Sequence, residues 1–303
     1  MIPRPLLDKI QKVFKEPILI DEPMKNHTTW RIGGPTDCLV QPTKEQEIID
    51  ILSLLHQEKI PYIVIGNGSN LLVSDQGLPG VVIKLGADYA SAAWNGYDVE
   101  VQAGMMLRAL SLESAERSLG GIEFAAGIPG SIGGAVRMNA GAYGSTIGEF
   151  VTKVVVIEYT GTRKEITADS LNFAYRYSSL FDMPAVVSMV HLRLLPGDKE
   201  ASFKKIREWL QIRNSKQPLD FPSCGSVFRN PQDSHAGYLV EQAGLRGRRV
   251  GEAMVSPKHG NFIINLGNAK ASDVRQLIME VQDEIERVYQ IRLEPEVRIL
   301  GEF

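Results

Sequence analysis

Residues 61–73 read PYIVIGNGSNLLV, a glycine-rich loop between two short apolar segments. The first segment, Pro61 to Ile65, and the second, Leu71 to Val73, have the composition of β-strands, and the residues between them are typical turn formers. We therefore predict that the loop from Gly66 to Asn70 joins two strands and does not lead from a strand into a helix.

This arrangement argues against a Rossmann dinucleotide fold. A Rossmann turn opens a helix whose positive N-terminal end faces the pyrophosphate. A loop between strands can still bind phosphate, because glycines let successive backbone N–H groups converge, and Ser69 and Asn70 add side-chain donors. An ordinary glycine-rich turn explains this loop equally well.

A second glycine-rich segment runs from Gly120 to Gly144 and is too long for one tight turn. Small residues let a planar or phosphorylated ligand approach the backbone closely. Pro129 fixes the entry to a turn, and a short helix is expected from Ser131 onward. Tight packing of protein elements is the alternative, but it requires several close contacts at once, so a bound ligand is favoured.

Hydrophobic periodicity predicts the other elements. Helices are expected at 6–14, 43–57, 202–216, 237–243 and 272–289, the second with Thr43 as N-cap and Gln46 completing a capping box. Strands are expected at 151–159, 186–194, 253–255 and 261–265, and the first two predict a sheet covered on one face. The linker from Leu195 to Asp198 indicates a domain boundary.

The composition is that of a globular protein of 303 residues, 44% of them hydrophobic and 23% charged. A formal net charge of -3 gives no general reason to expect nucleic acid or an anionic membrane as a partner. The two distant cysteines, Cys38 and Cys224, argue against a disulfide framework and a zinc site, and they suit a reducing cytosol. The N-terminus does not resemble a signal peptide, and no segment has transmembrane length. We expect a cytoplasmic protein without a metal.

Seven sequence blocks, taken together and in order, resemble the UDP-N-acetylenolpyruvoylglucosamine reductase family of peptidoglycan synthesis, and they extend over nearly the whole chain. They are Asn26 to Gly34, Gly66 to Leu72, Gly120 to Gly144, Tyr175 to Ser178, Cys224 to Pro231, Ala243 to Gly247 and Leu293 to Val297. One block alone is a weak signal, but seven in sequence are specific.

The resemblance implies an α+β protein with a two-lobed FAD-binding region of the vanillyl-alcohol-oxidase (PCMH) type at residues 1–195, its lobes dividing at about residue 85. A substrate-binding domain would follow at 196–303, with its last strand returning to the active site. FAD would be bound without a covalent link, and NADPH would be the co-substrate. The implied cofactor-binding residues are Gly66, Asn67, Gly68, Ser69, Asn70, Leu71, Gly127, Pro129, Gly130, Ser131, Gly133, Gly134, Asn139 and Gly141.

The spacing of two motifs points to a subtype. Arg176 and Ser226 are 50 residues apart, which is short beside family members that carry a tyrosine-bearing insertion between these motifs. The chain therefore resembles the type II enzymes. Closure over the substrate by that insertion is not assumed here.

The resemblance implies reduction of UDP-N-acetylglucosamine enolpyruvate to UDP-N-acetylmuramate. Hydride added to the methylene carbon drives negative charge onto the neighbouring carboxylate, which needs positive charge or an acid close by. The family motif places Arg176 at this carboxylate, where a guanidinium can bind both oxygens. An ion pair at a strand edge is the alternative role for this arginine.

Two further residues match catalytic positions of the family. Glu296 would polarise the substrate carboxylate, which requires it to be protonated or to share a proton. Alternatively, Glu294 or Glu296 faces solvent on an edge that contains Pro295. Ser226 would protonate the carbon next to the carboxylate, although a serine hydroxyl is a weak acid. Cys224 is a competing donor, because strand alternation would place it on the same face as Ser226.

Contacts to the UDP-sugar are implied for Tyr175, Asn230, Arg246, Lys258 and His259. Arg246 and Lys258 are candidates for the diphosphate, and Arg248 or Arg249 could take over from Arg246. A solvated surface explains any one of these residues as well. The partners would be small molecules, and we expect a monomer.

Two other functions are compatible with parts of the sequence. An FAD-dependent oxidase or dehydrogenase of the same fold, acting on another alcohol or sugar, would share the glycine-rich segments, but Arg176, Ser226 and Glu296 argue against it. A sugar-nucleotide-binding module without flavin is disfavoured, because both glycine-rich segments are present.

Overall fold

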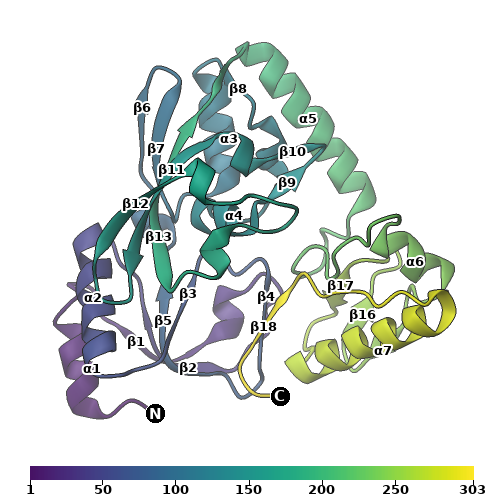
Figure 1. Ribbon diagram of the computed structural model, residues 1–303. Coiled ribbons are helices and arrows are strands. Elements are labelled where there is room, and N and C mark those ends of the chain that lie inside the picture. Colours follow the sequence, from purple (N-terminus) through teal and green to yellow (C-terminus); the bar gives the residue numbers. More distant parts are fainter. The chain divides into compact units, whose positions relative to one another are not determined.

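The computed structural model of the protein describes residues 1–303 (Figure 1). The chain forms two compact units, each built from separate stretches of sequence. Unit 1 comprises Met1–Ile20, Cys38–Asn67 and Gly80–Gln211, and unit 2 comprises Asp21–Asp37, Gly68–Pro79 and Ile212–Phe303. The units interleave along the chain, whereas the sequence suggests a single boundary between residues 195 and 196. The assignment of flavin and substrate to separate domains stays a prediction.

Two helices and a four-stranded sheet form the N-terminal part of the fold. The helices are α1 (Arg4–Gln11) and α2 (Glu45–Gln57), and the sheet has the order β1 (Leu19–Pro23), β2 (Pro35–Val40), β5 (Leu78–Lys84), β3 (Tyr62–Ile65). In α2, Ile48, Ile51, Leu52 and Leu55 repeat at helical spacing and are all buried. The hydrophobic periodicity that predicts this helix therefore marks the face of α2 that packs into the core.

The predicted cap of α2 is wrong. The helix begins at Glu45, with Lys44 at the N-cap and no capping side chain. Thr43 instead donates its backbone N–H (2.7 Å) and its hydroxyl (3.1 Å) to a carboxylate oxygen of Glu47. A charged oxygen accepts these bonds more strongly than the neutral amide of Gln46 would, so Glu47 fixes the turn before the helix.

The second sheet of unit 1 has five antiparallel strands, in the order β12 (Arg163–Thr167), β11 (Val151–Glu158), β13 (Ala185–Arg193), β7 (Asp98–Gln102), β6 (Ala92–Asn95). Strands β11 and β13 confirm the two strands predicted here. The prediction that only one face of this sheet is covered is wrong in β11. Successive strand residues point to opposite faces of a sheet, and the consecutive residues Val154, Val155, Val156 and Ile157 are all buried, so both faces are covered there. Helix α2 packs against β11, and α4 (Ile132–Met138) packs against β13 and β7.

The long glycine-rich segment forms short elements in unit 1. Helix α4 begins directly after Ser131, its N-cap, which confirms the helix predicted there. The remaining elements of this unit are α3 (Leu107–Glu116), β8 (Leu119–Gly120), β9 (Gly141–Ala142), β10 (Ser145–Thr146), β14 (Leu195–Pro196) and most of α5 (Lys199–Lys216). Short 3-10 helices of this unit lie at Ala87–Tyr89, Glu123–Gly127, Ile147–Glu149, Ala168–Ser170 and Ser179–Phe181, and a further one lies in unit 2 at Met24–His27.

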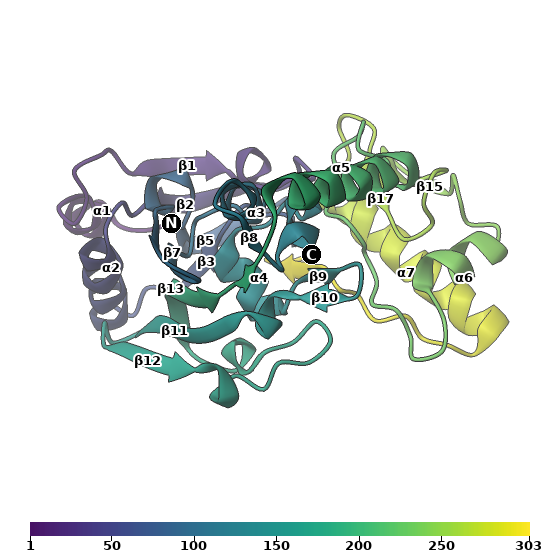
Figure 2. The same ribbon diagram turned by 90° about the horizontal axis from the view of Figure 1, so that it is seen from above.

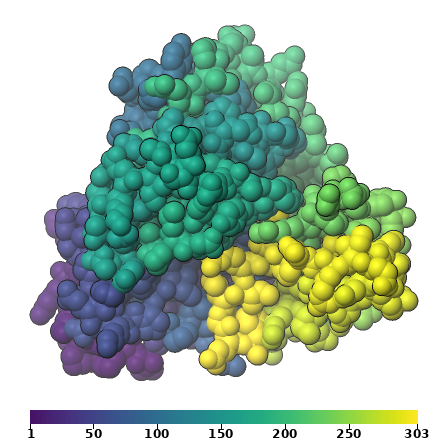
Figure 3. Space-filling model, in the orientation of Figure 1, coloured from purple at the N-terminus to yellow at the C-terminus, as the bar shows by residue number.

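Unit 2 is an α+β module. Its antiparallel sheet has the order β15 (Arg249–Val250), β16 (Ala253–Val255), β17 (Ile263–Asn265), and its helices are α6 (Ala236–Gln242) and α7 (Ala271–Tyr289). These elements confirm the helices and strands predicted for this region. Helix α7 packs against β16 (Figure 1) and against α6 (Figure 2). The residues from α7 to the C-terminus, yellow in Figure 3, form a continuous part of the surface. No helix of the chain has the length and apolarity needed to cross a membrane.

Segments distant in sequence are joined within unit 2. Strand β4 (Leu71–Val73), which follows the first glycine-rich loop as predicted, pairs in parallel with β18 (Arg298–Leu300). Two residues further on, the carboxylate of Asp75 accepts the backbone N–H groups of Ala271 (2.7 Å) and Ser272 (3.0 Å) in the first turn of α7. A carboxylate at this position satisfies N–H groups that the helix itself leaves without acceptors.

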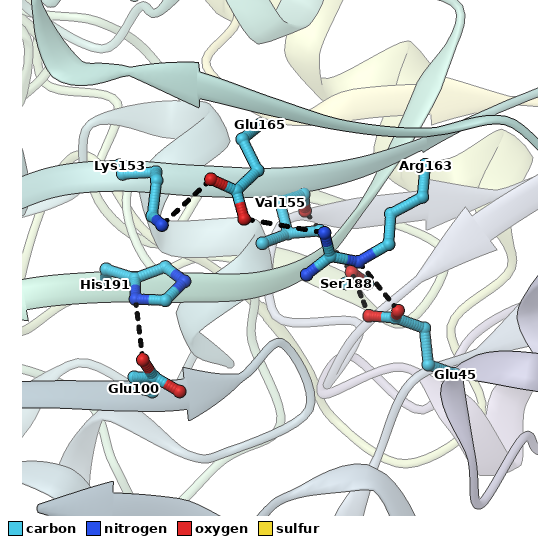
Figure 4. A network of polar contacts seen from close by, with 8 residues as sticks. All are labelled: Glu45, Glu100, Lys153, Val155, Arg163, Glu165, Ser188 and His191. Atoms are coloured by element: carbon cyan, nitrogen blue, oxygen red, sulfur yellow. Dashed lines mark hydrogen bonds and ion pairs between the residues drawn. The ribbon is translucent and has the colours of Figure 1, made fainter.

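Figure 4 shows a network of polar side chains on the five-stranded sheet of unit 1. Lys153, His191 and Glu100 stand opposite one another on three neighbouring strands. The Nδ1 atom of His191 lies 3.4 Å from a Glu100 oxygen, whereas its Nε2 atom is buried without a hydrogen-bond partner. Burial, and next the positive charge of Lys153, hold the pKa of His191 below its ordinary value of 6.5.

The environment of His191 predicts a pH dependence of stability. Because the unfolded chain binds the proton more readily than the folded one, stability is retained above about pH 6.5 and is lost as the pH falls through the folded pKa. We expect the melting temperature to fall between pH 7.5 and pH 5.5, and to fall less in His191→Gln. Replacing the exposed His56 in the same way is the control, and an equal change in both variants would contradict this account.

Candidate active site

The two glycine-rich segments meet in unit 1. The side-chain N–H of Asn67 donates to the carbonyl oxygen of Pro129 (2.6 Å). A Cβ atom on Gly66 would collide with the Ser131 hydroxyl, and a Cβ on Gly133 would lie 2.8 Å from that of a neighbouring alanine. Glycine at position 66 therefore lets the first loop lie against the Ser131 side chain of the second segment, and Gly133 lets α4 lie against Ala103.

These residues fit a flavin nucleotide. Where the two segments meet, Gly66 contributes no side chain and lies against the Ser131 hydroxyl. Backbone N–H groups of such glycine-rich turns are suited to hold a pyrophosphate. The part of the predicted cofactor site that the structure brings together is thus Gly66 and Asn67 with Pro129 to Ser131.

The later residues of the first loop belong to unit 2. Gly68 has a positive φ of 66°, and a Cβ there would collide with the carbonyl oxygen of His27. Asn70 donates its side-chain N–H to the carbonyl oxygen of Glu296 (3.0 Å), and its own carbonyl oxygen accepts the N–H of Arg298 (3.0 Å). In this structure Gly68 and Asn70 serve packing and chain pairing, and cofactor contacts by Gly68, Ser69, Asn70 and Leu71 stay predictions.

The remaining predicted cofactor residues lie along the long segment of unit 1. Gly127 ends a 3-10 turn, Gly134 lies within α4, and Gly141 begins β9. Asn139 ends α4 in the left-handed conformation and is buried. Contacts of these four residues, and of Gly130, to a flavin stay predictions.

Arg176 occupies a tight turn of unit 1. Ala174 and Tyr177 bridge across the turn, which consists of Tyr175 and Arg176. The guanidinium of Arg176 donates to the carbonyl oxygen of Gly141 (3.4 Å) and lies 5.3 Å from the centre of the Tyr175 ring. Tyr175 is 54% exposed. The turn presents a permanent positive charge beside an accessible aromatic ring.

Ser226 and Glu296 lie on adjacent segments of unit 2. The N–H of Glu296 donates to the carbonyl oxygen of Val227 (2.7 Å), and Phe228 bridges to Pro295. The extended segment around Pro295 thus runs alongside the one that follows Ser226. The structure therefore brings together two of the three predicted catalytic residues within one unit.

Cys224 does not share the surroundings of Ser226, so the prediction of a common strand face is wrong. Gly225 between them has a φ of 83°, which interrupts the alternation of an extended strand. Cys224 is 5% exposed, whereas Ser226 lines a pocket. Burial, and next the negative charge of Glu296, raise the pKa of the Cys224 thiol.

The pocket beside Ser226 has a volume of about 290 Å³. It is lined by four of the predicted catalytic and substrate-binding residues, which are Ser226, Asn230, Arg246 and His259. It also contains residues that sequence reasoning missed, which are His235, Gly237, Tyr238, Glu241, Gly260 and Asn261. Lys258 does not line this pocket, and its ammonium donates to the carbonyl oxygen of Asn214 (2.6 Å).

His259 is a neutral hydrogen-bond donor in this pocket. Its Nδ1 atom accepts the backbone N–H of Asn261 (3.1 Å), so the ring proton lies on Nε2. Burial, and next the positive charge of Arg246, lower the pKa of His259. Gly237 leaves room for the ring, because a Cβ there would lie 3.1 Å from it.

Comparison with known proteins identifies the family. Residues 217–300 match the model of the UDP-N-acetylenolpyruvoylglucosamine reductase C-terminal domain, and residues 36–167 match an FAD binding domain. The chain is 42% identical over 299 residues to UDP-N-acetylenolpyruvoylglucosamine reductase 2 of Symbiobacterium thermophilum, covering 98% of this chain and 97% of the relative. The chain belongs to the UDP-N-acetylenolpyruvoylglucosamine reductase family.

Other members agree over the same length. The reductase of Bacillus subtilis is 42% identical over 300 residues, with 97% of this chain and 99% of that protein covered. The crystal structure of the reductase from Thermus caldophilus has a TM-score of 0.81 and 35% identity, and covers 94% of this chain. The fold predicted from the seven blocks is therefore confirmed as the fold of this reductase family.

The charges of the pocket beside Ser226 are balanced. Arg246 is its only permanent cation and Glu241 its only carboxylate, and they pair at 2.6 Å. Arg248 and Arg249, the alternatives to Arg246, lie outside the pocket, where Arg248 pairs with Glu280 at 2.8 Å. Any anion that binds Arg246 must compete with Glu241.

Proposed function

We propose that this protein reduces UDP-N-acetylglucosamine enolpyruvate to UDP-N-acetylmuramate, with NADPH as hydride source and FAD as carrier, in peptidoglycan precursor synthesis. The observation that carries the proposal is family membership over 98% of the chain, at 42% identity. The position of Ser226 in a pocket of unit 2, next to the Glu296 segment, supports it. We further propose that the enzyme acts in the cytoplasm as a monomer.

The residues of unit 1 that fit the cofactor are Gly66, Asn67 and Pro129 to Ser131. Bound FAD would supply hydride transfer between NADPH and the methylene carbon of the enolpyruvyl group. The protein's own residues would then manage the charge and the proton that this transfer creates.

Arg176 would bind the substrate carboxylate. Charge develops on this carboxylate as hydride adds to the methylene carbon and the other carbon of the double bond, next to the carboxylate, becomes nucleophilic. A guanidinium can hold both carboxylate oxygens through parallel hydrogen bonds. The exposed Tyr175 beside it would contact the sugar nucleotide.

Glu296 and Ser226 would complete the reaction. Glu296 would share a proton with the substrate carboxylate, because an ionised side chain would repel the developing charge. Ser226 would give its hydroxyl proton to the carbon next to the carboxylate and so set the lactyl stereocentre. A serine is strong enough as an acid only because this carbon is very basic.

The pocket of unit 2 would hold part of the UDP-sugar, with Asn230, Arg246 and the neutral His259 as donors. A diphosphate has to displace Glu241 from Arg246 in order to bind there. Lys258 would contribute only after leaving its bond to the Asn214 carbonyl oxygen.

Replacing Glu241, which competes with a bound diphosphate for Arg246, gives a testable result. We expect Glu241→Gln to lower KM for the UDP-sugar roughly threefold to tenfold, because a surface ion pair and the like-charge repulsion no longer oppose binding. The effect should shrink at high ionic strength. Glu280→Gln is the matched control, since it frees Arg248 outside the pocket. A higher KM in Glu241→Gln would mean that Glu241 itself holds the substrate or orients Arg246.

An anaerobic titration tests the function. The flavin spectrum of purified protein is recorded, NADPH is added to bleach it, and UDP-N-acetylglucosamine enolpyruvate is then added. Rapid recovery of the oxidised band is the expected result. Bleaching without recovery would indicate a flavoprotein with another electron acceptor, and protein without any flavin band would refute the proposal.

A further inference from the structure

Both polar atoms of the Asn139 side chain form hydrogen bonds inside unit 1. The residue is 4% exposed and ends α4 with a φ of 44°. Its Nδ2 atom donates to the carbonyl oxygen of Ala174 (2.9 Å), and its Oδ1 atom accepts the N–H of Gly148 (3.0 Å). Asn139 therefore links the end of α4 to the segment that carries Arg176.

The turn with Arg176 rests on residues 137–141 at three points. Before the turn, Ala174 accepts from Asn139, and after it the hydroxyl of Ser178 donates to the carbonyl oxygen of Arg137 (2.8 Å). At its tip, the guanidinium donates to the carbonyl oxygen of Gly141. The long glycine-rich segment thus has a second use at its C-terminal end, as a platform for this turn.

The backbone of the turn needs such support. Arg176 has a φ of 56°, a left-handed conformation that side-chain-bearing residues adopt at a cost in energy. It persists only where the surroundings fix it. The site also matches the shape of asparagine, because a Cβ on Gly148 would lie 2.7 Å from Asn139 Oδ1.

We infer that Asn139 is a positioning residue for Arg176, acting through the carbonyl oxygen of Ala174. This inference rests on the proposed function, in which Arg176 binds the substrate carboxylate. It gives Asn139 a role in the second half of the reaction, where the carboxylate takes up charge, and none in the transfer from NADPH to the flavin.

Asn139→Asp separates the two hydrogen bonds of the amide. An aspartate still accepts the Gly148 N–H, but it places an oxygen, in place of a donor, against the carbonyl oxygen of Ala174. We expect reoxidation of the reduced enzyme by the enolpyruvyl substrate to slow roughly 10- to 100-fold, as misplacement of a catalytic group by about an ångström does. If Asn139 acts through Arg176, bound flavin per chain and the rate of bleaching by NADPH stay as in the unmodified protein, whereas the flavin contact that the sequence predicts for Asn139 would lower both in this variant.

The chain offers a matched control in Asn172. This residue also has a φ of 44°, and its side-chain N–H donates to the Ser179 hydroxyl (3.0 Å), outside the platform. Asn172→Asp should alter neither half of the reaction. A positioning role also predicts that Asn139→Asp has little further effect in an Arg176→Ala background, because both changes then act through one missing group.

Three results would overturn the inference. They are loss of flavin from Asn139→Asp, an unchanged reoxidation rate, or a full additional loss in the Arg176→Ala background. If Asn139→Asp does not fold, Ser178→Ala removes the other tie of the turn and must show the same selective slowing. Failure of the unmodified protein to be reoxidised by the substrate would refute the proposed function instead.

Discussion

Replacing Ser226 with alanine is expected to slow reoxidation of the reduced enzyme by the enolpyruvyl substrate roughly 10²- to 10⁴-fold, the usual contribution of a positioned general acid. Ser226 lines the pocket of unit 2, and the variant leaves that pocket's other donors in place. Bleaching by NADPH should be unaffected, because it involves no protonation of the substrate carbon. Stopped-flow absorbance of the flavin separates the two steps.

Cys224→Ala is the control for this experiment. The Cys224 thiol has a lower intrinsic pKa than the Ser226 hydroxyl. It is buried and lies outside the pocket, and its burial raises the thiol pKa above the ordinary value. We expect Cys224→Ala to keep the rate of reoxidation. A large loss in this variant together with a small one in Ser226→Ala would make the cysteine the proton donor.

Local sequence patterns were sufficient for most helices and strands. The strand, loop and strand of residues 61–73 and the amphipathic helix α7 depend on residues near one another in the chain, so composition and periodicity reveal them. The cap of α2 shows the limit of such patterns. Thr43 could bond to Gln46, three residues later, or to Glu47, four residues later, and only the folded backbone selects Glu47.

Contacts between distant segments explain what the sequence could not predict. The face of Cys224 follows from the positive φ of Gly225, which strand alternation does not anticipate. His235, Tyr238 and Glu241 look like the solvated side of a short helix, and only the fold places the loop around His259 opposite them in one pocket. No pattern of spacing signals such a meeting.

The same reasoning applies to the residues that support the proposed catalytic residues. The sequence predicts that Asn70 belongs to a phosphate-binding loop, and in the structure its side chain donates to the carbonyl oxygen of Glu296, 226 residues away. The sequence predicts a flavin contact for Asn139, and in the structure its amide donates to the carbonyl oxygen of Ala174, 35 residues away. Both asparagines belong to motifs of the family. A motif does not show whether a residue contacts a ligand itself or positions another residue that contacts the ligand.

Arg176→Lys tests the second large expected effect. Lysine keeps the positive charge but cannot hold both carboxylate oxygens through a planar fork, so we expect reoxidation to slow roughly 10²- to 10³-fold, as on loss of one donor to a developing anion. Arg176→Ala should be slower still. Arg193→Lys, which alters the two-bond pairing of another arginine with Asp98 on the same unit, is the matched control.

Equilibrium binding locates the loss on the carboxylate. UDP-N-acetylmuramate carries the lactyl carboxylate, and UDP-N-acetylglucosamine lacks it, so titration calorimetry with both ligands isolates this group. If Arg176 binds the carboxylate, Arg176→Lys weakens binding of the first ligand and leaves that of the second unchanged. Equal weakening of the binding of both ligands would place Arg176 at the sugar nucleotide. Unchanged binding of both ligands, together with a normal reoxidation rate, would leave Arg176 only the role of a surface ion pair, which the sequence alone also allows.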